Sequence, residues 1–216
     1  MHNMKKVIIY SHGFGVKADA RGMFKEIAAT FPDYKAAMFD YNQVLPNGDT
    51  IVASIDNQAR RLQDIIDEAG ADEIVLLCHS QGCIVAGLVD LSKISKVILL
   101  APPVVASMQH VIQKLSKKPG SEYLQAGVSK LARSDGSMTF LPNEYMQSLD
   151  EINPIELYKK IADQKVTCII RATNDEVLGL ADLSAVAAHQ MVDIAANHDF
   201  TGESRQALIA ALKRLL

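Results

Sequence analysis

Six short runs of apolar, largely β-branched residues constrain the fold of this chain more than any other feature. Most of these runs are continuously apolar rather than alternating, and longer amphipathic stretches separate them. Strands of this kind are covered on both faces, which is typical of a parallel sheet flanked by helices. The pattern predicts an α/β fold with about six mostly parallel strands, at residues 6–10, 35–40, 73–78, 96–100, 165–171 and 190–195.

Four amphipathic stretches between these runs predict helices, at residues 20–31, 50–69, 81–94 and 203–216. Asp49 and Thr50 are suitable N-cap residues for the second helix, and Gly70 is a suitable stop. Strands and helices therefore alternate through the first four strands, and the alternation resumes after a long interruption.

The interruption covers residues 102–164. We expect residues 103–163 to form a cap inserted over the sheet of a single domain that spans residues 1–216. Within this inserted segment the sequence predicts helices at 104–115, 143–149 and 154–162. The step Asp135-Gly136, within residues 131–140, predicts a two-residue hairpin turn. Apolar side chains of the segment can line an acyl pocket, and we expect Met138 and Phe140, together with Val177, to contact substrate.

Charge and composition exclude several classes of function. A formal net charge of −3 gives no electrostatic reason to bind nucleic acid or an anionic membrane surface. No apolar run reaches the length of a membrane span, and the apolar start is too short for a signal peptide. Cys78, Cys83 and Cys168 each lie inside an apolar element, so we expect reduced thiols in a cytoplasmic protein. The sequence leaves the oligomeric state open.

Ser80 lies between a predicted strand and a predicted helix, in the sequence Cys78-His79-Ser80-Gln81-Gly82. This motif resembles the nucleophile elbow of α/β-hydrolases, G-x-S-x-G, in which a sharp turn exposes the serine hydroxyl above the sheet. Cysteine stands where the pattern has its first glycine, and its side chain is compact. A serine that only caps the following helix is the alternative interpretation.

A second motif, Ser11-His12-Gly13-Phe14-Gly15, follows the first predicted strand. It resembles the oxyanion-hole loop of the same family. The resemblance implies that the backbone N–H groups of Phe14 and Gln81 stabilise a negatively charged oxygen during the reaction. A phosphate-binding loop is the alternative, but neither the Lys-Ser/Thr pair nor a third glycine follows at the required spacing.

Two further residues complete the resemblance. His198 follows the last predicted strand and precedes the last predicted helix, where the family places its general base. Asp175 follows the fifth predicted strand in a loop that resembles the family's acid loop, and Glu176 is a rival one residue away. The order Ser80, Asp175, His198 along the chain matches the family order.

The resemblance implies a serine hydrolase that cleaves a carboxylic ester of a small molecule through an acyl-enzyme, with no cofactor and no metal. The motifs look most like those of small carboxylesterases of the cinnamoyl/feruloyl-esterase kind. A thioesterase, an amidase or a carbon–carbon bond hydrolase uses the same residue types. A non-catalytic ligand-binding protein on the same fold is the alternative from a different class of function.

Overall fold

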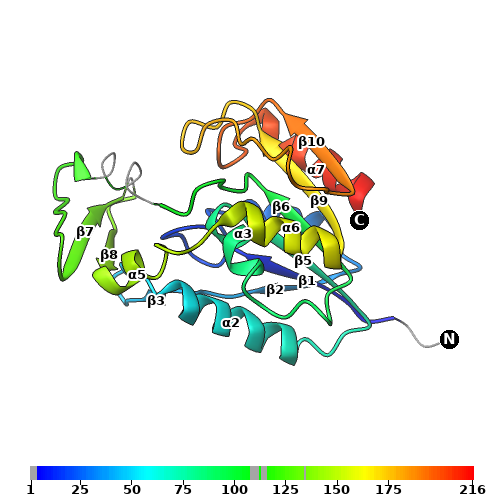
Figure 1. Cartoon of the computed structure of the whole chain (residues 1–216), viewed down its shortest axis with the longest axis horizontal. Helices are drawn as coiled ribbons and strands as arrows, with labels where there is room; N and C mark the ends of the chain where they lie inside the picture. Colours follow the sequence, from blue (N-terminus) through cyan, green and yellow to red (C-terminus); the bar gives the residue numbers. More distant parts are fainter. Residues whose placement is uncertain (1–3, 108–111, 113–115, 134) are drawn as a thin grey trace.

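A single six-stranded parallel sheet forms the centre of the protein (Figure 1). The computed structural model describes residues 4–107, 112, 116–133 and 135–216. The strand order is β10-β9-β6-β5-β1-β2, and every pairing within the sheet is parallel. The six predicted strands are confirmed to within two residues: β1 (Lys6–Ser11), β2 (Lys35–Met38), β5 (Glu73–His79), β6 (Lys96–Leu100), β9 (Val166–Ala172) and β10 (Gln190–Ile194).

Helices cover both faces of this sheet, which explains why its strands are continuously apolar. Successive side chains of a strand point to opposite faces. Val7 and Ile9 of β1 pack into one core, while Ile8 and Tyr10 pack into the other. The first core contains α2 (Ile55–Glu68), α3 (Gln81–Ala86) and α6 (Pro154–Gln164), and the second contains α1 (Met23–Thr30) and α7 (Glu203–Leu215).

The predicted start of the second helix is wrong. Thr50 belongs to a short strand, β4 (Thr50–Ile51), and α2 begins only at Ile55. The strand forms because β4 pairs with a strand almost ninety residues further along the chain, in which Thr139 lies opposite Thr50. The N–H of Ile55, which has no partner within the helix, donates a hydrogen bond to the Ser148 hydroxyl at 3.0 Å.

The helix after Ser80 is shorter than predicted. It ends at Ala86 instead of residue 94, and the N–H groups of Gly87 and Leu88 bond to carbonyls three residues back. A side chain at Gly87 would place its Cβ 2.5 Å from the Cβ of Leu157 in α6. The helix therefore ends where α6 packs closely against it.

A second, four-stranded sheet lies beside the central one, at the left of Figure 1. Its order is β3-β4-β8-β7, and it combines β3 (Gln43–Val44) and β4 with an antiparallel hairpin of β7 (Val128–Ala132) and β8 (Met138–Pro142). The hairpin itself was expected. Its connection is longer than the predicted two residues, because the N–H of Arg133 bonds to the carbonyl of Ser137 beyond the Asp135-Gly136 step.

The other predicted helices of the inserted segment have mixed outcomes. Residues 143–149 and 154–162 correspond to α5 (Asn143–Gln147) and α6. Most of the helix predicted at 104–115 lies outside the described residues, and residues 104–107 are not helical. The chain between β9 and β10 consists of turns, so the strict alternation of strand and helix does not resume after the interruption.

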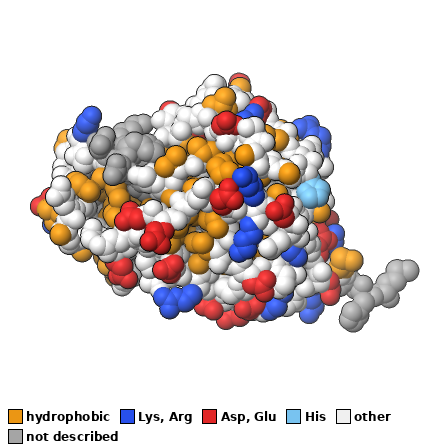
Figure 2. Space-filling view, in the orientation of Figure 1, with side chains coloured by type: hydrophobic (Ala, Val, Ile, Leu, Met, Phe, Trp, Pro, Cys, Tyr) orange, Lys and Arg blue, Asp and Glu red, His pale blue; other side chains and the backbone are white. Residues whose placement is uncertain are grey.

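The surface view in the same orientation shows acidic and basic side chains interspersed, together with apolar side chains near the middle of this face (Figure 2). Among the helices of the described residues, none is both long enough and apolar enough to cross a membrane.

Candidate active site

Ser80 occupies a sharp turn between β5 and α3. Its backbone has φ 54° and ψ −126°, a conformation that side-chain-bearing residues rarely adopt. The neighbouring strand holds the turn in place, because the N–H of Ser80 donates to the carbonyl of Leu100 in β6 at 3.0 Å. The hydroxyl of Ser80 is thereby raised above the carboxyl end of the sheet, in the manner of the elbow expected from the sequence.

Two glycines permit the close packing around this turn. A Cβ on Gly82 would lie 2.3 Å from the carbonyl oxygen of Ser11, and a Cβ on Gly13 would lie 3.0 Å from the Cβ of Ser80. Cys78, which replaces the first glycine of the pattern, fits because its side chain is fully buried in the core. Burial raises the pKa of the Cys78 thiol well above its usual value, so the thiol stays protonated.

His198 follows β10 and reaches Ser80. Its Nε2 lies 2.9 Å from the Ser80 Oγ, and its Nδ1 lies 2.7 Å from the Asp175 Oδ2. Both His198 and Asp175 are buried. The structure therefore brings together the three residues that the sequence analysis selected, in one continuous chain of hydrogen bonds.

Asp175 is held by its own loop as well as by His198. Its Oδ1 accepts hydrogen bonds from the N–H groups of Val177 and Leu178, each at 2.8 Å. Burial raises the pKa of Asp175, but the hydrogen bond from His198, its charge and the two amides outweigh burial, and the net pKa is lowered. Glu176 has a different contact: its carboxylate accepts the backbone N–H of His198 at 3.1 Å, not the imidazole.

The loop after β1 approaches Ser80 from the other side. His12 stabilises it, because its Nδ1 bonds to the carbonyl of Gly13 at 2.9 Å and its Nε2 accepts the N–H of Tyr41 at 3.1 Å. Phe14 and Gln81 both line the cavity at Ser80. Among the described residues, no acceptor takes a hydrogen bond from the backbone N–H of either one, so both amides are free to bind a substrate oxygen.

A buried chain of polar side chains supports these two amides. The Gln81 side chain donates to Gln58 Oε1 at 2.7 Å and accepts from the Tyr145 hydroxyl at 2.6 Å. The ring of Tyr145 stacks on the ring of Phe14 with centroids 5.6 Å apart. Tyr145 therefore contacts both of the residues that carry the free amides. The sequence analysis missed this role, because nothing local to residue 145 indicates a contact 64 residues away.

The cavity above Ser80 has a volume of about 210 Å³. Val177 lines it, as expected. Met138 and Phe140 are not among the described residues of its wall, since both lie on β8 in the second sheet. The described residues of the inserted segment that line the cavity are Pro103, Val105, Ala106, Ser107, Arg133, Tyr145 and Leu149.

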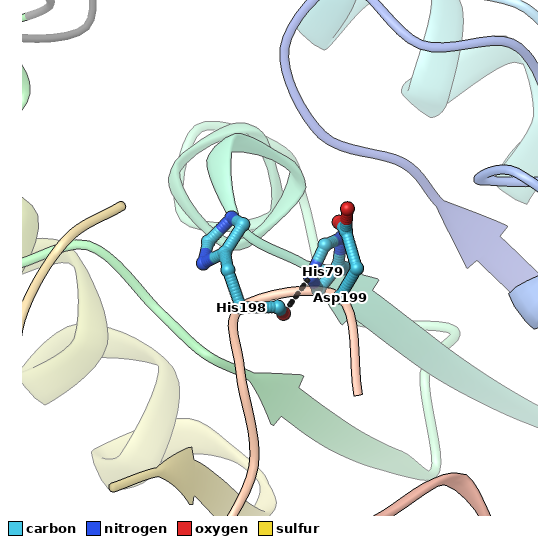
Figure 3. A group of neighbouring side chains, drawn as sticks. All are labelled: His79, His198 and Asp199. Carbon is cyan, nitrogen blue, oxygen red and sulfur yellow. Dashed lines mark hydrogen bonds between the residues drawn. The ribbon is translucent and has the colours of Figure 1, made fainter. Parts of the chain in front are cut away.

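His79, His198 and Asp199 form a group in which one possible metal-ligand atom of each residue lies within 4.8 Å of the others. Sequence spacing gave no sign of it. Figure 3 shows these side chains beside one another: the rings of His79 and His198 have centroids 4.9 Å apart, and His79 Nε2 donates to the His198 carbonyl at 3.0 Å. Asp199 is paired with Arg21. Each residue of the group thus has a hydrogen-bonding role that requires no metal.

The environment of His79 keeps its imidazole neutral. Burial, followed by the nearby His198, lowers the pKa of His79 to about 4. A neutral His79 with its proton on Nε2 is the form that donates to the His198 carbonyl. Residue 79 therefore ties the strand that carries Ser80 to the loop that carries His198.

Comparison with known proteins identifies the fold. No family model and no curated protein matches the sequence. Est1E from Butyrivibrio proteoclasticus superposes with a TM-score of 0.68 at 17% identity, covering 99% of this chain and 87% of that one. A monoacylglycerol lipase from Paleococcus ferrophilus gives 0.66 at 14% identity, covering 98% and 95%.

A third similar structure is the thioesterase domain from the curacin biosynthetic pathway. It superposes with a TM-score of 0.63 at 15% identity, covering 97% of this chain and 91% of that one. Similarity at these levels of identity concerns the fold, and the central sheet, its flanking helices and the turn at Ser80 agree with it. This chain has the α/β-hydrolase fold, in a form whose central sheet contains six parallel strands.

Proposed function

We propose that this protein is a serine hydrolase that cleaves carboxylic esters through an acyl-enzyme. The observation that carries the proposal is the hydrogen-bonded chain from Ser80 through His198 to Asp175, which begins at a residue with positive φ. A serine hydroxyl is a weak nucleophile unless a base removes its proton, and the base must be held in the correct tautomer. We assign His198 to the first requirement and Asp175 to the second, on the strength of their hydrogen bonds.

In the first half of the reaction, the Ser80 Oγ attacks the carbonyl carbon of the ester while His198 Nε2 takes the hydroxyl proton. Asp175 keeps the other proton on Nδ1 and stabilises the imidazolium that forms. The tetrahedral oxygen becomes negatively charged, and the free amides of Phe14 and Gln81 donate hydrogen bonds to it. The intermediate then collapses, and His198 returns its proton to the departing alcohol.

In the second half, a water molecule repeats these steps on the acyl-enzyme. His198 removes its proton, the hydroxide oxygen attacks the acyl carbon, and Ser80 leaves as the restored hydroxyl. The cavity wall suits a small, largely apolar acyl group, because Phe14, Ile84, Leu149 and Val177 contribute apolar side chains.

We further propose that the chain acts as one domain and that residues 103–163 determine substrate preference. Tyr145 and Leu149 of this inserted segment line the cavity, whereas the three triad residues lie outside the segment. Substitutions in the segment should therefore change the relative kcat/KM of different acyl groups more than the reactivity of Ser80.

A fluorophosphonate probe tests the proposal directly, because it reacts covalently with an activated serine. The wild-type protein should be labelled at Ser80, as mass spectrometry of the labelled peptide would show. Ser80→Ala should abolish labelling and lower kcat by about 10⁶ if the triad acts as a unit. Ser11→Ala is a matched control, since Ser11 is a buried serine whose hydroxyl hydrogen-bonds to Tyr41 and Gly82 and does not contact His198 or Asp175.

A substrate panel then separates the alternatives. Esters, thioesters and amides of graded acyl length should be compared with the wild-type protein, and esters should give the highest kcat/KM. A folded wild-type protein that neither reacts with the probe nor hydrolyses any of these substrates would refute the proposal.

A further inference from the structure

Arg133 lies at the border between two cavities. It follows β7 and lines both the cavity above Ser80 and a neighbouring cavity of about 570 Å³. One nitrogen, Nη2, donates to the carbonyls of Phe14 at 3.2 Å and Gly15 at 2.6 Å. The guanidinium also lies 5.6 Å from the centre of the Phe14 ring. These contacts fix a cationic side chain beside the proposed oxyanion loop.

The charges of Asp135 and Asp199 act on Arg133, but neither carboxylate lies within ion-pairing distance of its guanidinium. No ion pair in the described part of the chain includes Arg133, although the side chain is partly buried. The carboxylates of the Ser80 cavity are already engaged: Asp199 with Arg21, and Glu176 with the backbone of His198. A buried charge that lacks a partner is costly, so such a group is normally neutralised by a neighbour or a ligand.

Three cationic side chains and two carboxylates line the neighbouring cavity. Lys17 and Arg21 line it together with Arg133. Two of these charges are paired elsewhere, Arg21 with Asp199 and Asp19 with Lys25, while Asp135 accepts hydrogen bonds from Ser137 and keeps its charge. Burial, followed by the charge of Arg21, lowers the pKa of Arg133 to about 10, which still leaves it charged at neutral pH.

We propose that Arg133 binds an anionic group, a carboxylate or a phosphate, at the end of the substrate remote from the ester bond. The Nε and Nη1 donors of Arg133 have no acceptor among the described residues, so either one can donate a charge-assisted hydrogen bond to an anionic oxygen. The ester would lie at Ser80 and the anion at the border of the second cavity. This inference rests on the proposed function and narrows its substrates to esters that carry a negative charge.

Matched substrates test this preference. Monomethyl succinate, glutarate, adipate and pimelate carry a carboxylate, while the corresponding dimethyl esters have nearly the same shape without the charge. At one of these chain lengths, wild-type kcat/KM for the half-ester should exceed that for the diester by at least about tenfold, as expected for a hydrogen bond between charged groups. No preference at any length would overturn the proposal.

Three variants separate anion binding from support of the oxyanion loop. Arg133→Met should remove the preference for the half-ester, and Arg133→Lys should retain part of it. Lys130→Met is the control, because it removes one positive charge from the same hairpin while Lys130 pairs with Glu122 and lines neither cavity. An equal loss for half-ester and diester in Arg133→Met would show a purely structural role and overturn the proposal.

Measuring how tightly the half-ester and the diester bind to the Ser80→Ala variant makes this test independent of turnover. Calorimetry should show that the preferred half-ester binds Ser80→Ala more tightly than the diester, and that adding Arg133→Met abolishes the difference. Equal binding of the two ligands would overturn the anion site even if esters are hydrolysed. Competition by acetate or by inorganic phosphate then identifies whether the site prefers a carboxylate or a phosphate. Absence of turnover and of fluorophosphonate labelling, by contrast, would refute the proposed function alone.

Discussion

Substitution of Asp175 by Asn should disable the site without unfolding the protein, and the loop geometry explains why. The N–H groups of Val177 and Leu178 both donate to Oδ1, so the carbonyl oxygen of an Asn side chain must occupy that position. Its NH₂ group then replaces Oδ2 and faces His198 Nδ1 at a distance of 2.7 Å. An NH₂ group donates, so Nδ1 must become the acceptor and the imidazole proton moves to Nε2.

In that tautomer His198 cannot accept the proton of Ser80. The corresponding change in a serine protease lowers kcat by about 10⁴, which corresponds to about 5 kcal/mol of activation free energy. We expect a loss of this size in Asp175→Asn. The melting temperature should change little, because the bonds from Val177 and Leu178 are retained.

Glu176→Gln is the matched comparison, since it also converts a carboxylate to an amide one residue away. The Gln oxygen can still accept the N–H of His198, so kcat should fall by no more than about fivefold. Ester turnover at saturating substrate and the rate of fluorophosphonate labelling measure both variants. A greater loss in Glu176→Gln than in Asp175→Asn, or nearly full activity in Asp175→Asn, would refute this reasoning.

Three further outcomes are expected. Gly82→Ala should lower the free energy of unfolding by about 3 kcal/mol in urea titrations, because its Cβ meets the rigid backbone of Ser11; an unchanged midpoint would contradict the packing. Cys83→Ala should keep ester turnover, since burial raises the pKa of the Cys83 thiol and leaves no nucleophilic thiolate; a folded but inactive variant would reopen a role for this thiol. The unfolded state binds a proton at His79 more tightly than the folded state does, so stability should fall as pH drops from about 6.5 towards 4, by on the order of 1–2 kcal/mol at pH 5. His79→Gln should reduce this pH dependence in the same titrations. An equal fall in the free energy of unfolding in the wild type and in His79→Gln would argue against this role of His79.

The sequence predicted the central sheet well because its signal is local. A strand buried on both faces must be apolar at every position, and residues 73–78 and 96–100 show this without reference to the rest of the chain. The same signal places the loops that carry Ser80, Asp175 and His198, whereas the choice of these residues came from the resemblance to α/β-hydrolases. Each lies just beyond the carboxyl end of a parallel strand, so the loops that carry them meet at one edge of the sheet.

The second sheet and part of the cavity wall could not be predicted in this way. Strands β3 and β4 contain only two residues each, and β4 exists because of its distant pairing with β8. The segment around Thr50 therefore resembled the start of a helix. Arg133 and Tyr145 have no local motif, since their contacts are to Phe14, Gly15 and Gln81 in other parts of the chain.

The contact between His79 and the carbonyl of His198 affects how accurately the serine and the histidine are aligned. In the sheet, β6 and β9 separate β5 from β10, so the two strands are three spacings apart, about 14 Å. Small changes in twist at each spacing would accumulate if the sheet alone set the distance between Ser80 and His198.

The hydrogen bond from His79 to the carbonyl of His198 connects the two loops directly, without passing through β6 and β9. It anchors the returning loop to the residue directly before Ser80, so the serine and the imidazole move together when the sheet flexes. Substitutions that alter the twist between β6 and β9 should therefore lower stability before they misalign the reacting atoms. Thermal unfolding and turnover measured on the same variants would separate these two effects.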